Sequence, residues 1–240
     1  MSKKILSFVL GSSFLYLLFY FLPIYDGNSQ AIFNNSDKLW VHRVLDYNDV
    51  NTKCTDFKGV EVDVFFEEGK KVFDVRHHGN YQGNSLLNYL QNINNNELYF
   101  WIDLKNLNKK NVFTVVERLN KLIENGVRKE HLIIESKNIE LLVLLQSEGF
   151  YVSYWLPSFN LFRSIYEVYQ VKGNLKKYKP NAISCSYHNV DFYSRKFPNY
   201  NLHCWTNGLK EGEDDYIVKK LSLRNNVKVI LVDFENNFLK

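Results

Sequence analysis

Short apolar runs rich in Val, Ile, Phe and Tyr recur along the chain, separated by stretches with a different spacing. The strand-like runs cover residues 38–44, 59–66 with 70–75, 97–105, 131–136, 150–156, 181–187, 201–206 and 227–234. Between several of them, apolar residues recur every three or four positions, which predicts helices over 85–93, 111–126, 138–149 and 213–225. Strands that alternate with helices in this way are typical of parallel βαβ units.

We therefore predict an α/β fold, a (β/α)₈ TIM barrel that spans residues 38–240. A doubly wound open sheet is the alternative, but no glycine fingerprint follows the first strand to favour it. With 240 residues and 45% hydrophobic content, the chain can bury one substantial core but not two full-sized enzymatic domains.

The first residues follow another pattern, in which Lys3 and Lys4 precede an uncharged run over 5–24. That length matches the roughly 20 apolar residues that cross a bilayer. We predict one hydrophobic helix in residues 1–26, which acts as a signal anchor, and a linker over 27–37. The two lysines would stay in the cytoplasm, so the barrel would be extracytoplasmic, in the periplasm or at the cell surface. A cleaved signal peptide, which would give a secreted protein, is the alternative.

Charge and cysteine content narrow the possible partners. The formal net charge is only +4 and the basic residues are scattered, which argues against nucleic-acid binding. None of the three cysteines has the spacing of a zinc site, and Cys185 and Cys204 lie in apolar runs as small buried residues. One disulfide is conceivable if the domain is exported. The sequence indicates no obligate protein partner.

Polar side chains gather where the first three strands end, and in a barrel those ends share one rim. They are His42, Arg43, Glu61, Asp63, Asp103 and Lys105, with His77 and His78 in the loop beyond the second strand. Each has a structural explanation when taken alone: a solvated strand face for the E-x-D pair, or neutralisation of Asp103 by Lys105. Their coincidence at one rim favours a functional site.

The chemistry of this set is coherent. Three carboxylates offer an all-oxygen site for a hard cation, Mg²⁺ or Ca²⁺. Arg43 and Lys105 can bind anionic oxygens, and two histidines can act as a base or nucleophile and an acid near neutral pH. A metal, two cations and paired imidazoles together indicate phosphodiester cleavage.

The motifs "VHRV", "GVEVDVFF", "VFDVRHHG" and "YFWIDLK" resemble those of the glycerophosphodiester phosphodiesterase superfamily of phospholipase-C-like barrels. Later runs are similar too: "LHCWTN" resembles its Trp-Thr strand, and "VKVILVDFEN" its closing strand with an acid near the tip. The resemblance implies that Glu61, Asp63 and Asp103 hold the metal, and that Arg43 and Lys105 bind phosphate. It further implies that His42 and His77, or alternatively His78, are the catalytic imidazoles, and that Trp205 lines the site.

Two departures from the family pattern concern the substrate. The E-N-T segment is missing between the first two strands, and the third acid is the Asp of "DLK" rather than Glu. Both are similar to the sphingomyelinase D-like branch. The expected activity is metal-dependent cleavage of a glycerophosphodiester or (lyso)phospholipid head group. The alternatives are a non-catalytic barrel that binds a surface glycan or phospholipid, and a phosphodiesterase that acts on a cell-envelope polymer.

Overall fold

The computed structural model describes residues 18–25, 27, 29, 37–158, 164–207 and 214–233. Most of the predicted N-terminal helix therefore lies outside the described residues. Of its described residues, only 18–21 are helical. Within the described part of the chain, no helix is long and apolar enough to cross a membrane.

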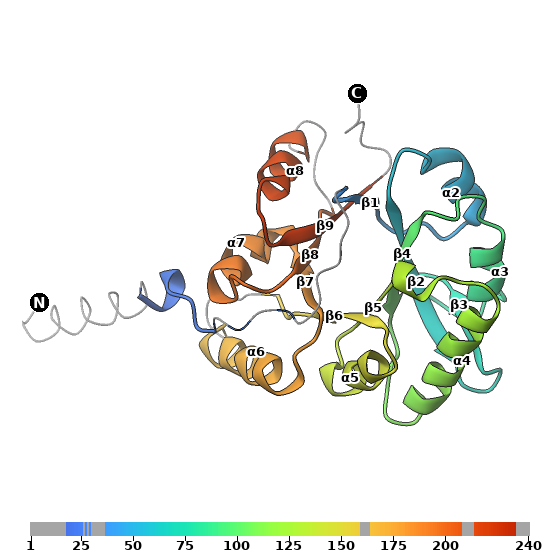
Figure 1. The fold of residues 1–240 in the computed structure, drawn as a ribbon, viewed down its shortest axis with the longest axis horizontal. Coiled ribbons are helices and arrows are strands. Elements are labelled where there is room, and N and C mark those ends of the chain that lie inside the picture. Colours follow the sequence, from blue (N-terminus) through green and yellow to red (C-terminus); the bar gives the residue numbers. More distant parts are fainter. Residues whose placement is uncertain are drawn as a thin grey trace, which may run out of the picture.

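Eight parallel strands of the described chain form a closed ring (Figure 1). In chain order they are β1 (Leu39–Val41), β2 (Gly59–Glu67), β4 (Tyr99–Leu104), β5 (Leu132–Ser136), β6 (Tyr151–Trp155), β7 (Ala182–Ser186), β8 (Leu202–Trp205) and β9 (Val227–Val232). The ring closes because β1 pairs with both β2 and β9, through Val41 with Val60 and with Val232. The predicted TIM barrel is confirmed, and the open-sheet alternative is wrong.

Helices surround the strands on the outside of the ring (Figure 1). They are α2 (Tyr47–Lys53), α3 (Leu86–Gln91), α4 (Val112–Glu124), α5 (Ile139–Ser147), α6 (Ser164–Tyr178), α7 (Tyr187–Lys196) and α8 (Asp214–Ser222), with a short 3₁₀ helix at Lys129–His131. The helices predicted at α3, α4, α5 and α8 are present. The apolar spacing did not reveal α2, α6 or α7, because each buries only a narrow stripe or begins inside an apolar run.

The run 70–75 is not a barrel strand. Its residues form β3 (Val72–Val75), which folds back antiparallel onto the distal half of β2, with Val64 opposite Val75. This hairpin returns the chain to the middle of β2, so that the residues after β3 lie beside Asp63.

Two apolar layers hold the barrel. The larger one lies between the strands and the helices, and the smaller one fills the ring with Trp40, Trp101, Ile133, Val229 and Leu231. The two layers follow from strand alternation, since successive side chains point to opposite faces.

The cysteines belong to the apolar layers. Cys54, Cys185 and Cys204 are all buried and free, so the disulfide considered from the sequence does not form. Burial raises the pKa of the Cys54 thiol to about 12, which keeps it protonated and unreactive at neutral pH.

Candidate active site

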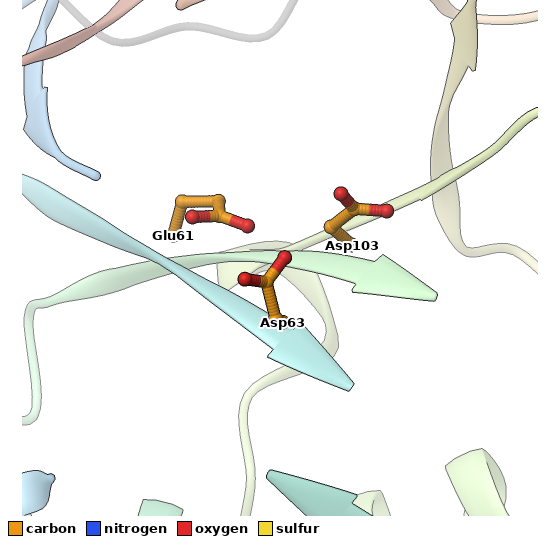
Figure 2. Close-up of side chains that lie close together, drawn as sticks. All are labelled: Glu61, Asp63 and Asp103. Carbon is orange, nitrogen blue, oxygen red and sulfur yellow. The ribbon is translucent and has the colours of Figure 1, made fainter. Parts of the chain in front are cut away.

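Three buried carboxylates face one another at the carboxyl ends of two neighbouring strands. Glu61 and Asp63 come from β2 and Asp103 from β4, where Asp63 and Asp103 are paired in register (Figure 2). Residues two apart in a strand point to the same side, so Glu61 and Asp63 both point into the ring. The structure thus brings together the three acids that the sequence predicted as metal ligands.

The geometry of this triad fits a hard divalent cation. One ligand oxygen from each acid lies within 4.8 Å of the others. Oxygen–metal bonds of about 2.0–2.6 Å require ligand oxygens of one ion to lie within about 5 Å of each other. Among the described residues, the buried Oδ1 atom of Asp103 has no hydrogen-bond partner, which leaves it available as a ligand.

Burial and mutual repulsion disfavour the fully ionised triad when no metal ion is bound. Burial, followed by the charges of Asp63 and Asp103, raises the pKa of Glu61 well above its usual value. Burial also raises the pKa of Asp103 to about 6, although Lys105 opposes it. At Asp63 burial has the same tendency, but Lys105 and His77 outweigh it and hold the pKa below its usual range. A divalent ion would relieve this repulsion.

Two cationic side chains border the triad. The Lys105 ammonium contacts both Asp63 Oδ1 and Asp103 Oδ2. Arg43 has a left-handed backbone with φ of 54°, and its amide N–H donates to Glu61 Oε2 at 2.7 Å. Its side-chain Nε lies 3.4 Å from Asp63 Oδ2. A non-glycine residue with positive φ is uncommon and concentrates at functional sites.

His42 is held between two acids. Its Nδ1 atom lies 3.0 Å from Asp233 Oδ1, and its Nε2 atom lies 3.8 Å from Glu61 Oε2. The hydrogen bond with His42 lowers the pKa of Asp233, so this carboxylate is ionised and orients the imidazole. The sequence suggested only an acid near the tip of the last strand. Its pairing with His42 spans 191 residues and depends on closure of the ring.

His77 reaches the triad, whereas His78 faces solvent. The Nδ1 atom of His77 contacts Asp63 Oδ2, and the His78 side chain is exposed. Burial lowers the pKa of His77 more than the Asp63 charge raises it, which favours the neutral ring. The preceding residue fixes this arrangement, because the Arg76 amide donates to the Asp63 carbonyl at 3.0 Å.

Most of these groups line a pocket of about 100 Å³ at the mouth of the barrel, and His77 and Asp233 lie outside its lining. Its lining residues are His42, Arg43, Glu61, Asp63, Trp101, Asp103, Lys105, Glu135, Trp155, Trp205, Asn207 and Leu231. Trp205 is where the sequence placed it. Glu135, Trp155 and Asn207 were not singled out, and the only available signal was their position at or just beyond a strand end.

A larger hollow of about 470 Å³ lies near the start of β4 and β5 and is lined largely by asparagine and aliphatic side chains. His131 lines it too, but its Nδ1 atom is 3.1 Å from the Leu98 carbonyl oxygen, as expected of a structural histidine. The three acids of the triad, His42, Arg43 and Lys105 all line the smaller pocket, which is therefore the candidate site.

Fold and site together define a TIM barrel whose mouth combines a candidate hard-metal site with fixed cations and carboxylate-oriented imidazoles. Solved structures with the same fold include a glycerophosphodiester phosphodiesterase from Parabacteroides distasonis, with a TM-score of 0.60 and 14% identity over 86% of this chain and 94% of that one. Another is an Oleispira antarctica phosphodiesterase in complex with its product sn-glycerol-3-phosphate, with a TM-score of 0.61 and 10% identity over 84% and 94%. No family model and no curated protein matches the sequence. At these identities, the likeness establishes the shared barrel fold.

Proposed function

We propose that the protein is a metal-dependent phosphodiesterase, a phosphoric diester hydrolase that cleaves glycerophosphodiesters. The observation that carries this proposal is the convergence, at the mouth of the barrel, of three acids within reach of a single ion and two histidines that each contact a carboxylate. A non-catalytic barrel has no need of that convergence. The phosphodiester substrate class is supported by the Oleispira antarctica structure of this fold, which holds sn-glycerol-3-phosphate.

Glu61, Asp63 and Asp103 would hold Mg²⁺ or Ca²⁺, which supplies Lewis-acid polarisation of a phosphoryl oxygen. Arg43 and Lys105 would bind the remaining phosphate oxygens, Arg43 as a fork and Lys105 as a point charge. Both cations are already held in place by the acids, so little ordering is required when an anionic substrate binds.

His42 and His77 would transfer the protons. A carboxylate at Nδ1 favours the tautomer with hydrogen on that atom, which leaves Nε2 as the acceptor. One imidazole would take the proton of the attacking hydroxyl, and the other would protonate the leaving alcohol. If that hydroxyl belongs to water, the product is a monoester. If it belongs to the substrate, the product is a cyclic phosphate, as expected for a sphingomyelinase D-like enzyme.

We also propose that the uncharged run that begins at Ile5 anchors the protein in a membrane with the barrel outside the cytoplasm, while its last residues, at Leu22 and Ile24, contact the barrel. Fractionation of cells that express the full chain, followed by protease treatment of intact cells or spheroplasts, tests this. A soluble cytoplasmic protein would contradict it.

The activity is tested with a panel of glycerophosphodiesters, lysophospholipids and a glycerol-phosphate polymer, assayed with Mg²⁺, with Ca²⁺ and with EDTA. We expect EDTA to abolish hydrolysis, and Glu61→Gln to lower kcat/KM by about 100-fold or more because a metal ligand loses its charge. His77→Gln should lower kcat by about 10²–10⁴-fold, the usual contribution of acid–base catalysis. His78→Gln is the matched control and should remain within a few-fold of wild type. Activity that resists both EDTA and Glu61→Gln would refute the mechanism.

A further inference from the structure

The rim of the candidate site carries an aromatic pair that lies beside cations. Trp155 at the end of β6 and Trp205 at the end of β8 meet edge to face, with ring centroids 5.2 Å apart. Aromatic walls of this kind commonly bind quaternary ammonium groups, because the negative face of the ring attracts a cation.

In this chain, lysine ammonium groups already lie over the Trp155 ring that would attract such a group. The Lys137 ammonium lies 4.0 Å from the centroid of the Trp155 ring, and the Lys105 ammonium lies 5.4 Å from it. Lys137 is the first residue after β5, at the carboxyl end of the barrel, and its side chain is exposed. The described residues place no carboxylate within ion-pair distance of Lys137, so its charge is available to a ligand.

Trp155 itself lines the pocket, so the Lys137 ammonium over its ring lies at the mouth of the barrel. Lys137 therefore belongs electrostatically to the mouth of the barrel, although it does not line the narrow part of the pocket. A ligand that extends from the acid triad past Trp155 meets two ammonium groups.

We propose that Lys137, placed over Trp155, is a specificity-determining residue that selects diesters with a neutral or anionic leaving group, such as a polyol or a phosphorylated polyol, and rejects choline-type head groups. This inference rests on the proposed function and specifies its substrate class. A quaternary ammonium next to Trp155 would face like charges on Lys105 and Lys137, whereas hydroxyl or phosphate oxygens would accept hydrogen bonds from them.

The test compares kcat/KM for glycerophosphoglycerol and glycerophosphocholine in the metal-loaded, full-length protein. We expect wild type to favour glycerophosphoglycerol by about tenfold or more, as one unfavourable charge contact near a surface implies. Lys137→Gln should shift the ratio towards choline by about tenfold, and Lys137→Glu should shift it further. Lys129→Gln is the matched control, because Lys129 precedes β5 and lies 4.5 Å from the Phe150 ring at the other end of the barrel.

Calorimetric titration with glycerol 3-phosphate and phosphocholine gives a second readout that needs no turnover. Wild type should bind glycerol 3-phosphate more tightly than phosphocholine. Lys137→Gln should narrow this difference in affinity, and Lys129→Gln should leave it unchanged. Tighter binding of phosphocholine by wild type, or a ratio that Lys137→Gln leaves unchanged, overturns the inference. Absence of hydrolysis with both diesters would refute the proposed function, and the binding data would still decide the role of Lys137.

Discussion

Glu135 shows how a barrel interior can hold an acid that has no place in the proposed mechanism. It lies in β5 in register with Asp103, and only 2% of it is exposed. Burial, reinforced by the charge of Asp103, raises its pKa well above the usual value. Burial therefore favours the neutral, proton-bearing form of Glu135, beside a triad whose charges a metal would compensate.

The protonation state of Glu135 predicts the pH dependence of stability. Because its folded pKa is raised, the folded protein keeps a proton that the unfolded chain releases above about pH 4.5. Its contribution to stability is therefore lost as pH rises above that value, by up to about 1.4 kcal/mol per pH unit. Glu135→Gln keeps the shape and removes the titration. In EDTA, the stability of this variant relative to wild type should increase with pH.

Urea unfolding of both proteins between pH 4 and 8 measures this difference. Glu124→Gln, at an exposed position at the end of α4, controls for the loss of one carboxylate. A pH-independent difference between wild type and Glu135→Gln would show that Glu135 is ionised in the folded state.

At the scale of elements, the start of β2 depends on a glycine. A Cβ atom on Gly59 would lie 2.4–2.7 Å from three atoms of the Trp40 ring, which is fully buried inside the barrel. The close approach of β2 to this ring fixes the position of the strand that carries Glu61 and Asp63. A side chain at position 59 would thus disturb both the core and the base of the site.

Gly59→Ala should lower the free energy of unfolding by about 1–3 kcal/mol, the usual cost of overpacking a core. Gly173→Ala provides a contrast, because Gly173 lies within α6 and its added Cβ would meet nothing within 4 Å. That change should raise stability by about 0.5–1 kcal/mol through helix propensity. Chemical denaturation of both variants measures the two changes in the free energy of unfolding. Equal stabilities would contradict the packing assigned to Trp40.

The sequence predicted those features that depend on local pattern. Glu61, Asp63 and Asp103 stand out because acids interrupt apolar strands, and parallel strands bring their carboxyl ends to one rim. The contact of Asp233 with His42 could not be predicted from the sequence, because it depends on the register of β1 against β9. Lys137 was also missed, since nothing in a single lysine after a strand indicates that it lies over Trp155.

On the scale of the whole molecule, the described N-terminal residues attach to the end of the barrel opposite the candidate site. The amide of Asn201, just before β8, donates to Ser29 Oγ at 2.9 Å, whereas Trp205 at the other end of β8 lines the pocket. The amide of Ile24 donates to the Lys196 carbonyl at 3.2 Å, beside α7 (Figure 1). The end of the predicted anchor, at Ile24, is thus fixed to the barrel away from the mouth.

Lys196 is the centre of this attachment and predicts how its stability changes with pH. Its side chain is fully buried, and its Nζ atom donates to the Leu22 carbonyl at 2.8 Å and lies 4.4 Å from the Phe19 ring. Burial lowers the pKa of Lys196 to about 8, from 10.5 in the unfolded chain. Between these two values the unfolded chain binds more protons, so this group makes wild type more stable as pH rises.

Lys196→Met keeps the buried stem but removes the titrating charge and the hydrogen bond to Leu22. In the full-length protein, we expect wild type to gain stability relative to this variant between pH 8 and 10, by up to about 1.4 kcal/mol per pH unit. Thermal unfolding at pH 7, 8, 9 and 10 measures it, with Lys219→Met, at an exposed position on α8, as the control for loss of one lysine. If both variants follow the same pH dependence, Lys196 is solvated, and the N-terminal segment is not held against α7.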